Sequence, residues 1–234
     1  MPNSKEKIPV ITIDGPAGSG KGTISQRVAD KLGWNILDSG ALYRLVALAA
    51  ERKGIAFDEK NTEANLSEVA QQLDVVFKPC EGGGVEVLLE NDDVTTAIRS
   101  EGCGNCASKV AANKGVRSAL LDRQRRFLSA PGLVADGRDM GTVVFPQADV
   151  KIFLTASAEI RAERRQNQLK ERGIDVNLRG LIRDIEERDA RDTNRKDAPL
   201  IPADDAIIID TGKQSIEEVV AKVMEALNQK NESR

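Results

Sequence analysis

The sequence contains no histidine among its 234 residues. This absence excludes Ser-His and Cys-His catalysis, histidine general bases and zinc sites that include histidine. Any chemistry must therefore depend on Lys, Arg and Asp side chains, on backbone amides and on metal ions that enter with a ligand.

Cysteine is scarce, with only Cys80, Cys103 and Cys106. The last two form a Cys-x-x-Cys pattern, which occurs in redox pairs and in halves of zinc sites. A structural zinc site normally needs four ligands, and only Cys80 is left as a third. We therefore interpret the cysteines as small buried or loop residues and predict no metal site made of protein side chains.

Long apolar runs and a strong charge excess are also missing. No run approaches the roughly 20 apolar residues of a membrane span, and Met1–Lys7 is polar, unlike a secretory signal. The net charge of −3 gives no broad attraction to nucleic acid. We expect a cytoplasmic protein that binds neither membrane nor nucleic acid. Because no long exposed apolar face is evident, we expect a monomer.

Five short apolar runs predict buried parallel strands. They are rich in β-branched residues and are followed by helical patterns, as in βα units. The runs are Val10–Ile13, Asn35–Leu37, Leu133–Ala135, Lys151–Leu154 and Ala206–Ile209. The chain length suits one α/β domain, so residues 1–234 are predicted to form a five-stranded parallel sheet flanked by helices.

One segment departs from this alternation. The strand-like runs Leu73–Lys78 and Val85–Glu90 are joined through Glu81–Gly84, which predicts a β-hairpin. Asp92–Ile98 is a candidate third strand. We therefore expect a small β-containing subdomain inserted over about residues 66–106.

The first strand leads directly into a glycine-rich segment that matches G-x-x-x-x-G-K, and a helix follows. Glycines allow successive N–H groups to turn toward an anion, and the helix N-terminus adds partial positive charge. Lys21 supplies a cation for the β- and γ-phosphates. This strand–loop–helix context predicts the ATP-binding P-loop of a P-loop NTPase-like fold. Its residues are Gly15, Pro16, Ala17, Gly18, Ser19, Gly20, Lys21, Gly22 and Thr23.

One position of this segment is unusual for a P-loop. Gly22 stands where the Ser or Thr that binds Mg²⁺ normally follows the lysine, and the hydroxyl is moved to Thr23. The Gly-Lys-Gly-Thr form resembles nucleoside monophosphate kinases rather than GTPases. The resemblance implies that Mg²⁺ is held largely by nucleotide phosphates and water, which suits the reluctance of magnesium to dehydrate.

Two predicted helices are strongly polar. Ala158–Arg172 has few large apolar residues, so we expect a helix that is mobile or bridges solvent. Leu178–Arg195 ends in a charged run, and its helical spacing places several charges on one face. A solvated face with ion pairs is one reading of this run, and phosphate binding is the other. The residues on this face are Arg188, Arg191, Asp192 and Arg195.

Three further segments resemble bacterial cytidylate kinases, which are P-loop nucleoside monophosphate kinases. They are Leu37–Arg44, Ala135–Pro146 with its Asp-Gly-Arg-Asp-Met-Gly-Thr run, and Arg188–Arg195 with its Arg-Asp-x-x-Arg run. With the P-loop they extend over nearly the whole chain. The inserted hairpin falls where bacterial members carry a small extra subdomain. The resemblance implies transfer of the γ-phosphoryl group of ATP to CMP and dCMP.

The resemblance also implies an acceptor site. In a doubly wound sheet, ligands bind beyond the carboxyl ends of the strands, and Ser39, Arg44, Arg138 and Asp139 follow such ends. By resemblance, Ser39, Ser108, Arg117 and Asp139 surround the base, Asp192 and Arg195 lie near the ribose and base, and Arg44, Arg138 and Arg188 bind the phosphate.

The chemistry of the base agrees with this assignment. A carboxylate such as Asp139 favours the amino group of cytosine, and an arginine such as Arg117 can donate to the cytosine acceptors. Uracil presents the opposite pattern, and mismatched buried polar groups give strong discrimination.

Transfer to an anionic phosphate oxygen requires positioning and charge neutralisation more than covalent help. We expect Lys21, Mg²⁺, Arg138 and Arg188 to hold the phosphate groups in line. Arg161 and Arg165 would close over the γ-phosphate from a helical lid of about residues 158–188. A P-loop kinase acting on another acceptor, such as UMP or AMP, is one alternative. A regulatory NTP-binding switch is another, less favoured one.

Overall fold

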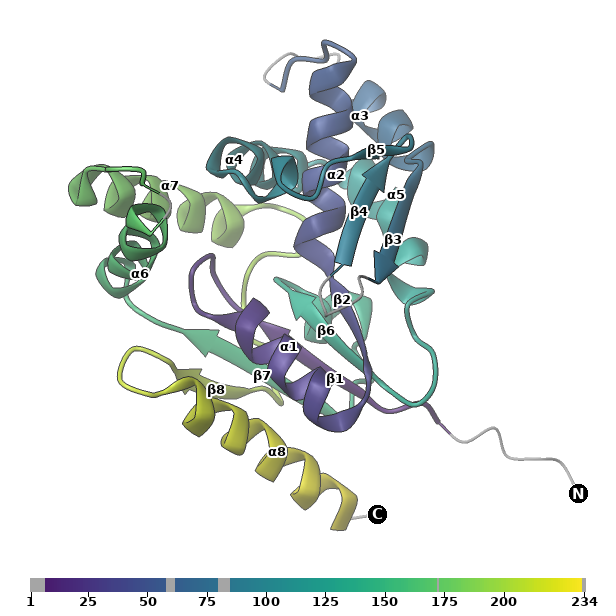
Figure 1. Ribbon diagram of the computed structural model, residues 1–234. Helices are drawn as coiled ribbons and strands as arrows, with labels where there is room; N and C mark the ends of the chain where they lie inside the picture. The colour runs from purple at the N-terminus through teal and green to yellow at the C-terminus, as the bar shows by residue number, and fades with distance from the viewer. Residues whose placement is uncertain (1–6, 58–61, 80–84, 172, 233–234) are drawn as a thin grey trace, which may run out of the picture. The chain divides into compact units, whose positions relative to one another are not determined.

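The computed structural model describes residues 7–57, 62–79, 85–171 and 173–232 (Figure 1). The chain divides into two compact units. The first unit comprises Met1–Asp38 and Gln124–Arg234, and the second comprises Ser39–Arg123. Cys80, the predicted connection Glu81–Gly84 and Arg172 lie outside the described residues.

The first unit is built on a five-stranded parallel sheet with the strand order β2-β6-β1-β7-β8. Each predicted strand is present within two residues of its expected bounds, so the predicted sheet is confirmed. All five residues of β1, at the centre, are buried, as its continuous apolar run indicates. The strands are β1 (Val10–Asp14), β2 (Asn35–Asp38), β6 (Leu133–Gly137), β7 (Val150–Thr155) and β8 (Ile207–Asp210).

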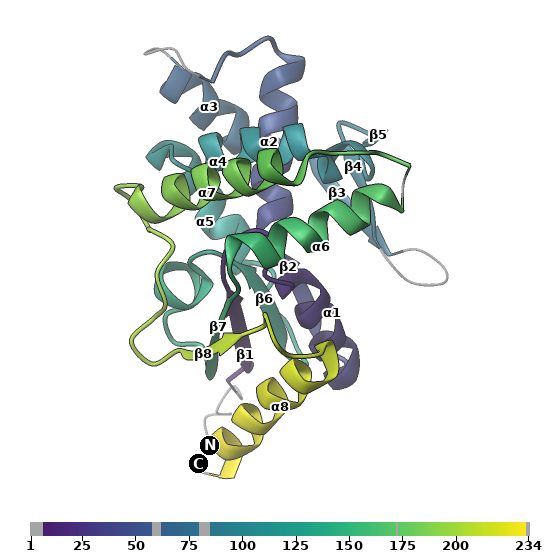
Figure 2. The same cartoon turned by 90° about the vertical axis from the view of Figure 1, so that its left-hand side faces the viewer.

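Two helices, α1 (Lys21–Leu32) and α8 (Ile216–Glu232), pack side by side on this sheet (Figures 1 and 2). Val28 of α1 and Val223 of α8 are both fully buried in a core shared with the strands. Burial of this apolar surface is the main force that holds the two helices on the sheet.

The ends of these helices follow from local sequence. α1 ends at Gly33, whose φ of 64° is the left-handed conformation that glycine accepts readily. At the start of α8, the Ser215 N–H donates to Glu218 Oε2 (2.7 Å) and the Glu218 N–H donates to Ser215 Oγ (3.2 Å). This reciprocal pair is a capping box, which satisfies two N–H groups of the first turn.

The rest of the first unit surrounds the carboxyl ends of the strands. A short π-helical turn, η2 (Met140–Val144), follows β6 directly. Two polar helices, α6 (Ala158–Lys170) and α7 (Leu178–Asn194), pack against each other (Figure 2).

The second unit contains a three-stranded antiparallel sheet with the order β3-β4-β5. The antiparallel pairing of β3 and β4 confirms the two strands of the predicted hairpin, whose connection lies outside the described residues. The third strand is shorter than expected. Asp93 Oδ1 accepts hydrogen bonds from the N–H (2.9 Å) and hydroxyl (2.6 Å) of Thr95, which turns the chain out of the strand. The strands are β3 (Val75–Pro79), β4 (Val85–Leu89) and β5 (Asp92–Asp93).

Helices make up the remainder of the second unit. They are α2 (Ser39–Arg52), α3 (Thr62–Gln71), the 3₁₀ turn η1 (Ala97–Arg99), α4 (Glu101–Val110) and α5 (Lys114–Arg125), of which the last two residues fall in the first unit. Of the helices in the described ranges of both units, none combines the length and apolar character that a membrane crossing needs.

Candidate functional site

Residues 15–23 form a tight loop between β1 and α1. Gly15 has a φ of 154°, and a Cβ there would lie 2.3 Å from the carbonyl oxygen of Leu154. Gly18 has a φ of 77°, and its Cβ would lie 3.1 Å from Cβ of Arg161. Gly20 is the N-cap of α1 and has no side chain to offer to the first N–H groups of the helix. The loop therefore presents these N–H groups to an anion.

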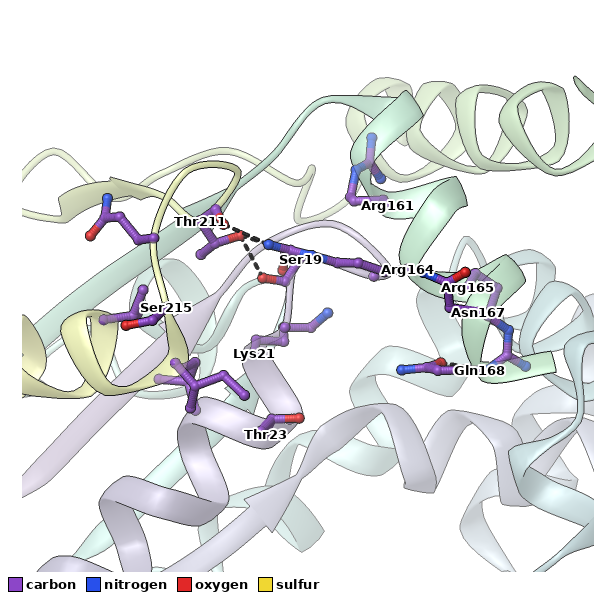
Figure 3. A pocket seen from close by; sticks show the side chains of 17 residues that line it. Ser19, Lys21, Thr23, Arg161, Arg164, Arg165, Asn167, Gln168, Thr211 and Ser215 are labelled. Atoms are coloured by element: carbon purple, nitrogen blue, oxygen red, sulfur yellow. Dashed lines mark hydrogen bonds between the residues drawn. The ribbon is translucent and has the colours of Figure 1, made fainter. Parts of the chain in front are cut away.

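A cavity of about 530 Å³ opens beside this loop (Figure 3). Three segments of the first unit line it: the loop with the first turn of α1, the polar helix α6, and the connection from β8 to α8 with the first turn of α8. In Figure 3, Arg165 and Gln168 lie on one side of the cavity and Thr211 and Ser215 on the other. Its polar lining residues include Ser19, Lys21, Thr23, Arg161, Arg164, Arg165, Asn167, Gln168, Thr211, Gln214 and Ser215.

Thr211 connects these three segments. Its hydroxyl accepts a hydrogen bond from Arg164 Nη1 (3.1 Å) and lies 3.0 Å from the carbonyl oxygen of Ser19 (Figure 3). Arg164 Nη2 also donates to the Thr211 carbonyl (2.6 Å). Sequence reasoning did not select Thr211 or Arg164. The position of Thr211, directly after a parallel strand, is the signal that could have found it.

Lys21 lies among charged side chains of both signs. Its Nζ donates to the carbonyl oxygen of Pro16 (2.9 Å). Burial lowers the pKa of Lys21 to about 7, with a further decrease caused by Arg138 and a smaller one by Arg188, while Asp136 opposes them. Arg138 and Arg188 thus act on Lys21 with like charge, only partly offset by carboxylates, and a negatively charged ligand would relieve this repulsion.

Two buried carboxylates accompany Lys21, and neither was among the expected site residues. Burial raises the pKa of Asp136 from 3.8 to about 7, although Lys21 acts in the opposite direction. Burial also raises the pKa of Asp14 to about 7, against the effect of hydrogen bonds from the N–H groups of Gly141 and Met140. Buried carboxylates with such raised pKa values are typical of functional sites.

Two crossed ion pairs join the end of β6 to the end of α7. Arg138 Nε lies 3.0 Å from Asp192 Oδ2, and Arg195 Nη2 lies 3.9 Å from Asp139 Oδ1. The side chains of Asp139, Asp192 and Arg195 are almost fully buried. The structure therefore brings together four of the residues that the sequence indicated.

The polar helix α6 is expected from its sequence to be mobile or to bridge solvent, but the side chain of its Arg161 is only 4% exposed. Its guanidinium donates to both carboxylate oxygens of Asp189 in α7 and to the carbonyl oxygen of Ala17 in the loop (3.0 Å). These partners compensate the buried charge. Arg165, also on α6, lines the cavity and donates to Gln168 Oε1 (3.1 Å).

The other expected residues belong to the second unit. Ser39 and Ser108 are buried at the start of α2 and within α4. Arg44 Nη1 donates to the carbonyl oxygen of Ile98 (2.7 Å). The guanidinium carbon of Arg117 lies 5.7 Å from the centre of the Tyr43 ring, a cation–π contact.

The cysteines and acidic residues are the remaining candidate metal ligands. Cys103 is buried, and its Sγ lies 3.4 Å from the carbonyl oxygen of Arg44. Burial raises the pKa of the Cys103 thiol, which disfavours the thiolate that binds metals. Within the ranges that the structure describes, no group of three or more His, Cys, Asp or Glu residues could hold a metal ion.

Comparison with known proteins gives consistent matches over most of the chain. The family model described as Cytidylate kinase matches residues 11–229. A cytidylate kinase from Marinomonas sp. (strain MWYL1) is 59% identical over 215 residues, which cover 92% of this chain and 93% of that protein. One from Shewanella loihica (strain ATCC BAA-1088 / PV-4) is 55% identical over 225 residues, 96% of each chain. Among solved structures, a shikimate kinase from Acinetobacter baumannii in complex with shikimate is 15% identical, with a TM-score of 0.43, over 96% of this chain and 95% of that chain.

Proposed function

This chain belongs to the cytidylate kinase family, and from that premise we propose that it transfers the γ-phosphoryl group of ATP to CMP, giving CDP and ADP. We extend the proposal to dCMP as a second acceptor. The observation that carries it is the convergence of Arg138 and Arg188 on Lys21 of the P-loop, where the charges of both arginines act on the lysine. Such a group of cations can hold a donor and an acceptor phosphate together.

ATP is the proposed occupant of the cavity beside α1. In this assignment residues 15–23 surround the β- and γ-phosphates, and Lys21 neutralises part of their charge. The remainder of the nucleotide would extend toward α6 and the β8–α8 connection, because these segments line the rest of the cavity. Thr211 and Gln214 thereby become candidate donor-binding residues.

The acceptor assignment rests on residue chemistry and on the family motifs. We assign Asp139 to the cytosine amino group, Asp192 and Arg195 to the ribose and base, and Arg138 and Arg188 to the phosphate. The ion pairs of Asp139 and Asp192 support this assignment, because they hold both carboxylates beside arginines in a buried environment. From the second unit, we assign Ser39, Ser108 and Arg117 to the base and Arg44 to the phosphate on the motifs alone.

Mg²⁺ is the proposed companion of ATP. The described residues lack a cluster of three or more metal-binding side chains, and the loop places Gly22 directly after Lys21. These residues fit an ion that enters with ATP and is held mainly by phosphates and water. Its contribution would be to neutralise charge on the phosphates.

The helical lid is proposed to cover residues 158–188, and the inserted subdomain residues 66–106, within a single kinase domain. Arg165 already lines the donor cavity. Arg161 donates to Asp189 and to the carbonyl oxygen of Ala17, which holds its guanidinium beside the P-loop. Closure of the lid would exclude water and limit ATP hydrolysis.

A coupled assay of ADP formation tests the proposed function. The acceptors are CMP, dCMP, UMP, AMP and non-nucleotide alcohols, each with ATP and Mg²⁺. We expect the highest kcat/KM with CMP and dCMP. A higher value with another acceptor would assign a different small-molecule kinase. Slow ADP formation that does not depend on any acceptor would instead indicate an NTP-binding switch.

A further inference from the structure

The turn η2, which follows β6, is held at its start by a carboxylate from another strand. Asp14, the last residue of β1, is only 5% exposed. Its Oδ1 accepts a hydrogen bond from the Met140 N–H and its Oδ2 accepts one from the Gly141 N–H, both at 2.8 Å. Asp14 therefore uses both oxygens on two consecutive N–H groups.

These two N–H groups are the ones that a helix cap would normally satisfy. Met140 and Gly141 are the first residues of η2, and the first N–H groups of a helix have no partner within it. Asp139 stands at the N-cap, a position where aspartate usually caps with its own carboxylate. In the part of the chain that the structure describes, the Asp139 side chain makes no such cap. Its Oδ1 instead lies 3.9 Å from Arg195 Nη2.

We propose that Asp14 is a specificity-determining positioning residue, which caps η2 from β1 and thereby keeps the Asp139 carboxylate directed away from the turn and toward the acceptor base. This inference rests on the proposed function, in which Asp139 accepts a hydrogen bond from the cytosine amino group. Without Asp14, the unsatisfied N–H groups of η2 would attract Asp139, the nearest carboxylate in the chain, into the ordinary cap geometry.

The other end of η2 provides a matched control. Arg125 Nε donates to the Val144 carbonyl (3.1 Å) and Arg125 Nη2 to the Val143 carbonyl (3.3 Å). Arg125 thus stabilises the same turn at the end away from Asp139. Asp149 is a second control, since it is a buried carboxylate that accepts a backbone hydrogen bond, from Val10 N–H (2.9 Å), at the opposite end of β1.

The test compares Asp14→Ala and Asp14→Asn with the wild type in steady-state kinetics. Asp14→Ala should raise KM for CMP and lower the CMP-over-UMP preference by about tenfold or more, the effect of unsatisfied buried donors. KM for ATP should change less than about threefold, because the P-loop cradle is formed by backbone groups. Asp14→Asn keeps one acceptor oxygen, so its KM for CMP and its CMP-over-UMP preference should lie between those of the wild type and of Asp14→Ala. Arg125→Met and Asp149→Asn should lower the Tm but leave the preference unchanged.

A double-mutant comparison shows whether Asp14 acts through Asp139. In an Asp139→Ala background, Asp14→Ala should change the CMP-over-UMP preference no further. An unchanged preference in Asp14→Ala, or an equal loss in both backgrounds, would overturn the inference.

Hydrogen exchange supplies a measurement that needs no substrate. Asp14→Asn retains the shape of the side chain, and the amides of Met140 and Gly141 should exchange faster in this variant than in the wild type. Unchanged exchange rates would refute the cap. This measurement remains decisive even if Asp14→Ala does not fold. If the wild type fails to phosphorylate CMP, the proposed function is refuted. The exchange rates would then still report whether Asp14 caps η2.

Discussion

Two features of the Lys21 environment disfavour the charged form of its side chain in the ligand-free protein. Lys21 is half-buried, and its removal from water, together with the like charges of Arg138 and Arg188, lowers its pKa to about 7. A bound polyphosphate would reverse this effect, because negative charge beside Lys21 favours its protonated form. This arrangement supports the proposed role of Lys21 in binding the phosphates of ATP.

Replacement of Lys21 tests this arrangement directly. Lys21→Ala should lower kcat for CDP formation by about 100-fold or more, because charge stabilisation at the transferred phosphoryl group is lost. The circular dichroism spectrum should stay unchanged. Lys31→Ala, at an exposed position in the last turn of the same helix, should keep the wild-type kcat. Near-wild-type turnover by Lys21→Ala would contradict the assigned role.

The Asp139 carboxylate is expected to distinguish cytosine from uracil. Asp139→Ala should reduce the ratio of kcat/KM for CMP to that for UMP by about 10- to 100-fold, because the acceptor that matches the cytosine amino group is removed. KM for ATP should change little. Asp205→Ala removes an exposed aspartate and should preserve the ratio. A selectivity that survives in Asp139→Ala would assign base recognition to other residues.

At the scale of elements, two arginines of α6 hold this helix in place through hydrogen bonds to other segments. Arg161 is held by Asp189 of α7 and by the P-loop carbonyl of Ala17, and Arg164 is held by Thr211 after β8. A helix with little apolar surface is thus fixed through arginines whose partners lie in three different segments. These contacts connect the position of α6 to the P-loop, which a lid over the phosphates requires.

A double-mutant cycle between Arg161→Met and Asp189→Asn measures this anchor. Each single variant should lower the free energy of unfolding by about 1–3 kcal/mol, because it leaves a largely buried partner without compensation. The double variant should be less destabilised than the sum, with a coupling of about 1 kcal/mol or more. Urea denaturation of all four proteins provides the values.

The exposed pair of Arg183 and Glu187, 4.0 Å apart on α7, is the control for this cycle. Its coupling should be close to zero, as for most surface ion pairs. Equal coupling in the two cycles would show that burial does not strengthen the Arg161 contact.

At the scale of the whole molecule, the sequence predicts the structural features that depend on residues close together in the chain. The strands, the loop around Lys21 and the Ser215–Glu218 capping box all follow from spacings of a few residues. The contacts of Asp14 do not, because its partners lie 126 and 127 residues away. An aspartate at the end of a strand gives no local sign that it caps a distant turn.

Burial of charge is the second property that the sequence does not reveal. Arg161 belongs to a polar helix and is expected to be solvated, yet it is buried because Asp189, 28 residues away, accepts its hydrogen bonds. The same holds for Asp136, whose neighbour Lys21 comes from another βα unit. Such pairs arise only when the parallel strands bring separate segments to one edge of the sheet.

The buried titratable groups give the ligand-free protein a distinct pH dependence of stability. Burial raises the pKa values of Asp14 and Asp136 from 3.8 to about 7. Between about pH 4 and pH 7 the folded chain keeps protons that the unfolded chain releases, so the free energy of unfolding falls as the pH rises. Lys21 acts above this range, because its lowered pKa of about 7 adds stability as the pH rises from about 7 to 10.5.

Asp136→Asn separates the contribution of one carboxylate, since the amide resembles the protonated acid and does not titrate. The variant should gain stability relative to the wild type from pH 5 to pH 7, by on the order of 2 kcal/mol in the free energy of unfolding, because over this range the folded wild type keeps a proton that the unfolded chain has already released. Urea denaturation without nucleotide at pH 5, 6 and 7 measures the difference.

Asp205→Asn is the control. Its free energy of unfolding should differ from that of the wild type by the same amount at all three pH values, because hydrogen bonding to Lys151 lowers the pKa of Asp205 and moves its titration below this range. A constant difference between Asp136→Asn and wild type from pH 5 to 7 would mean that Asp136 is already ionised in the folded protein at pH 5.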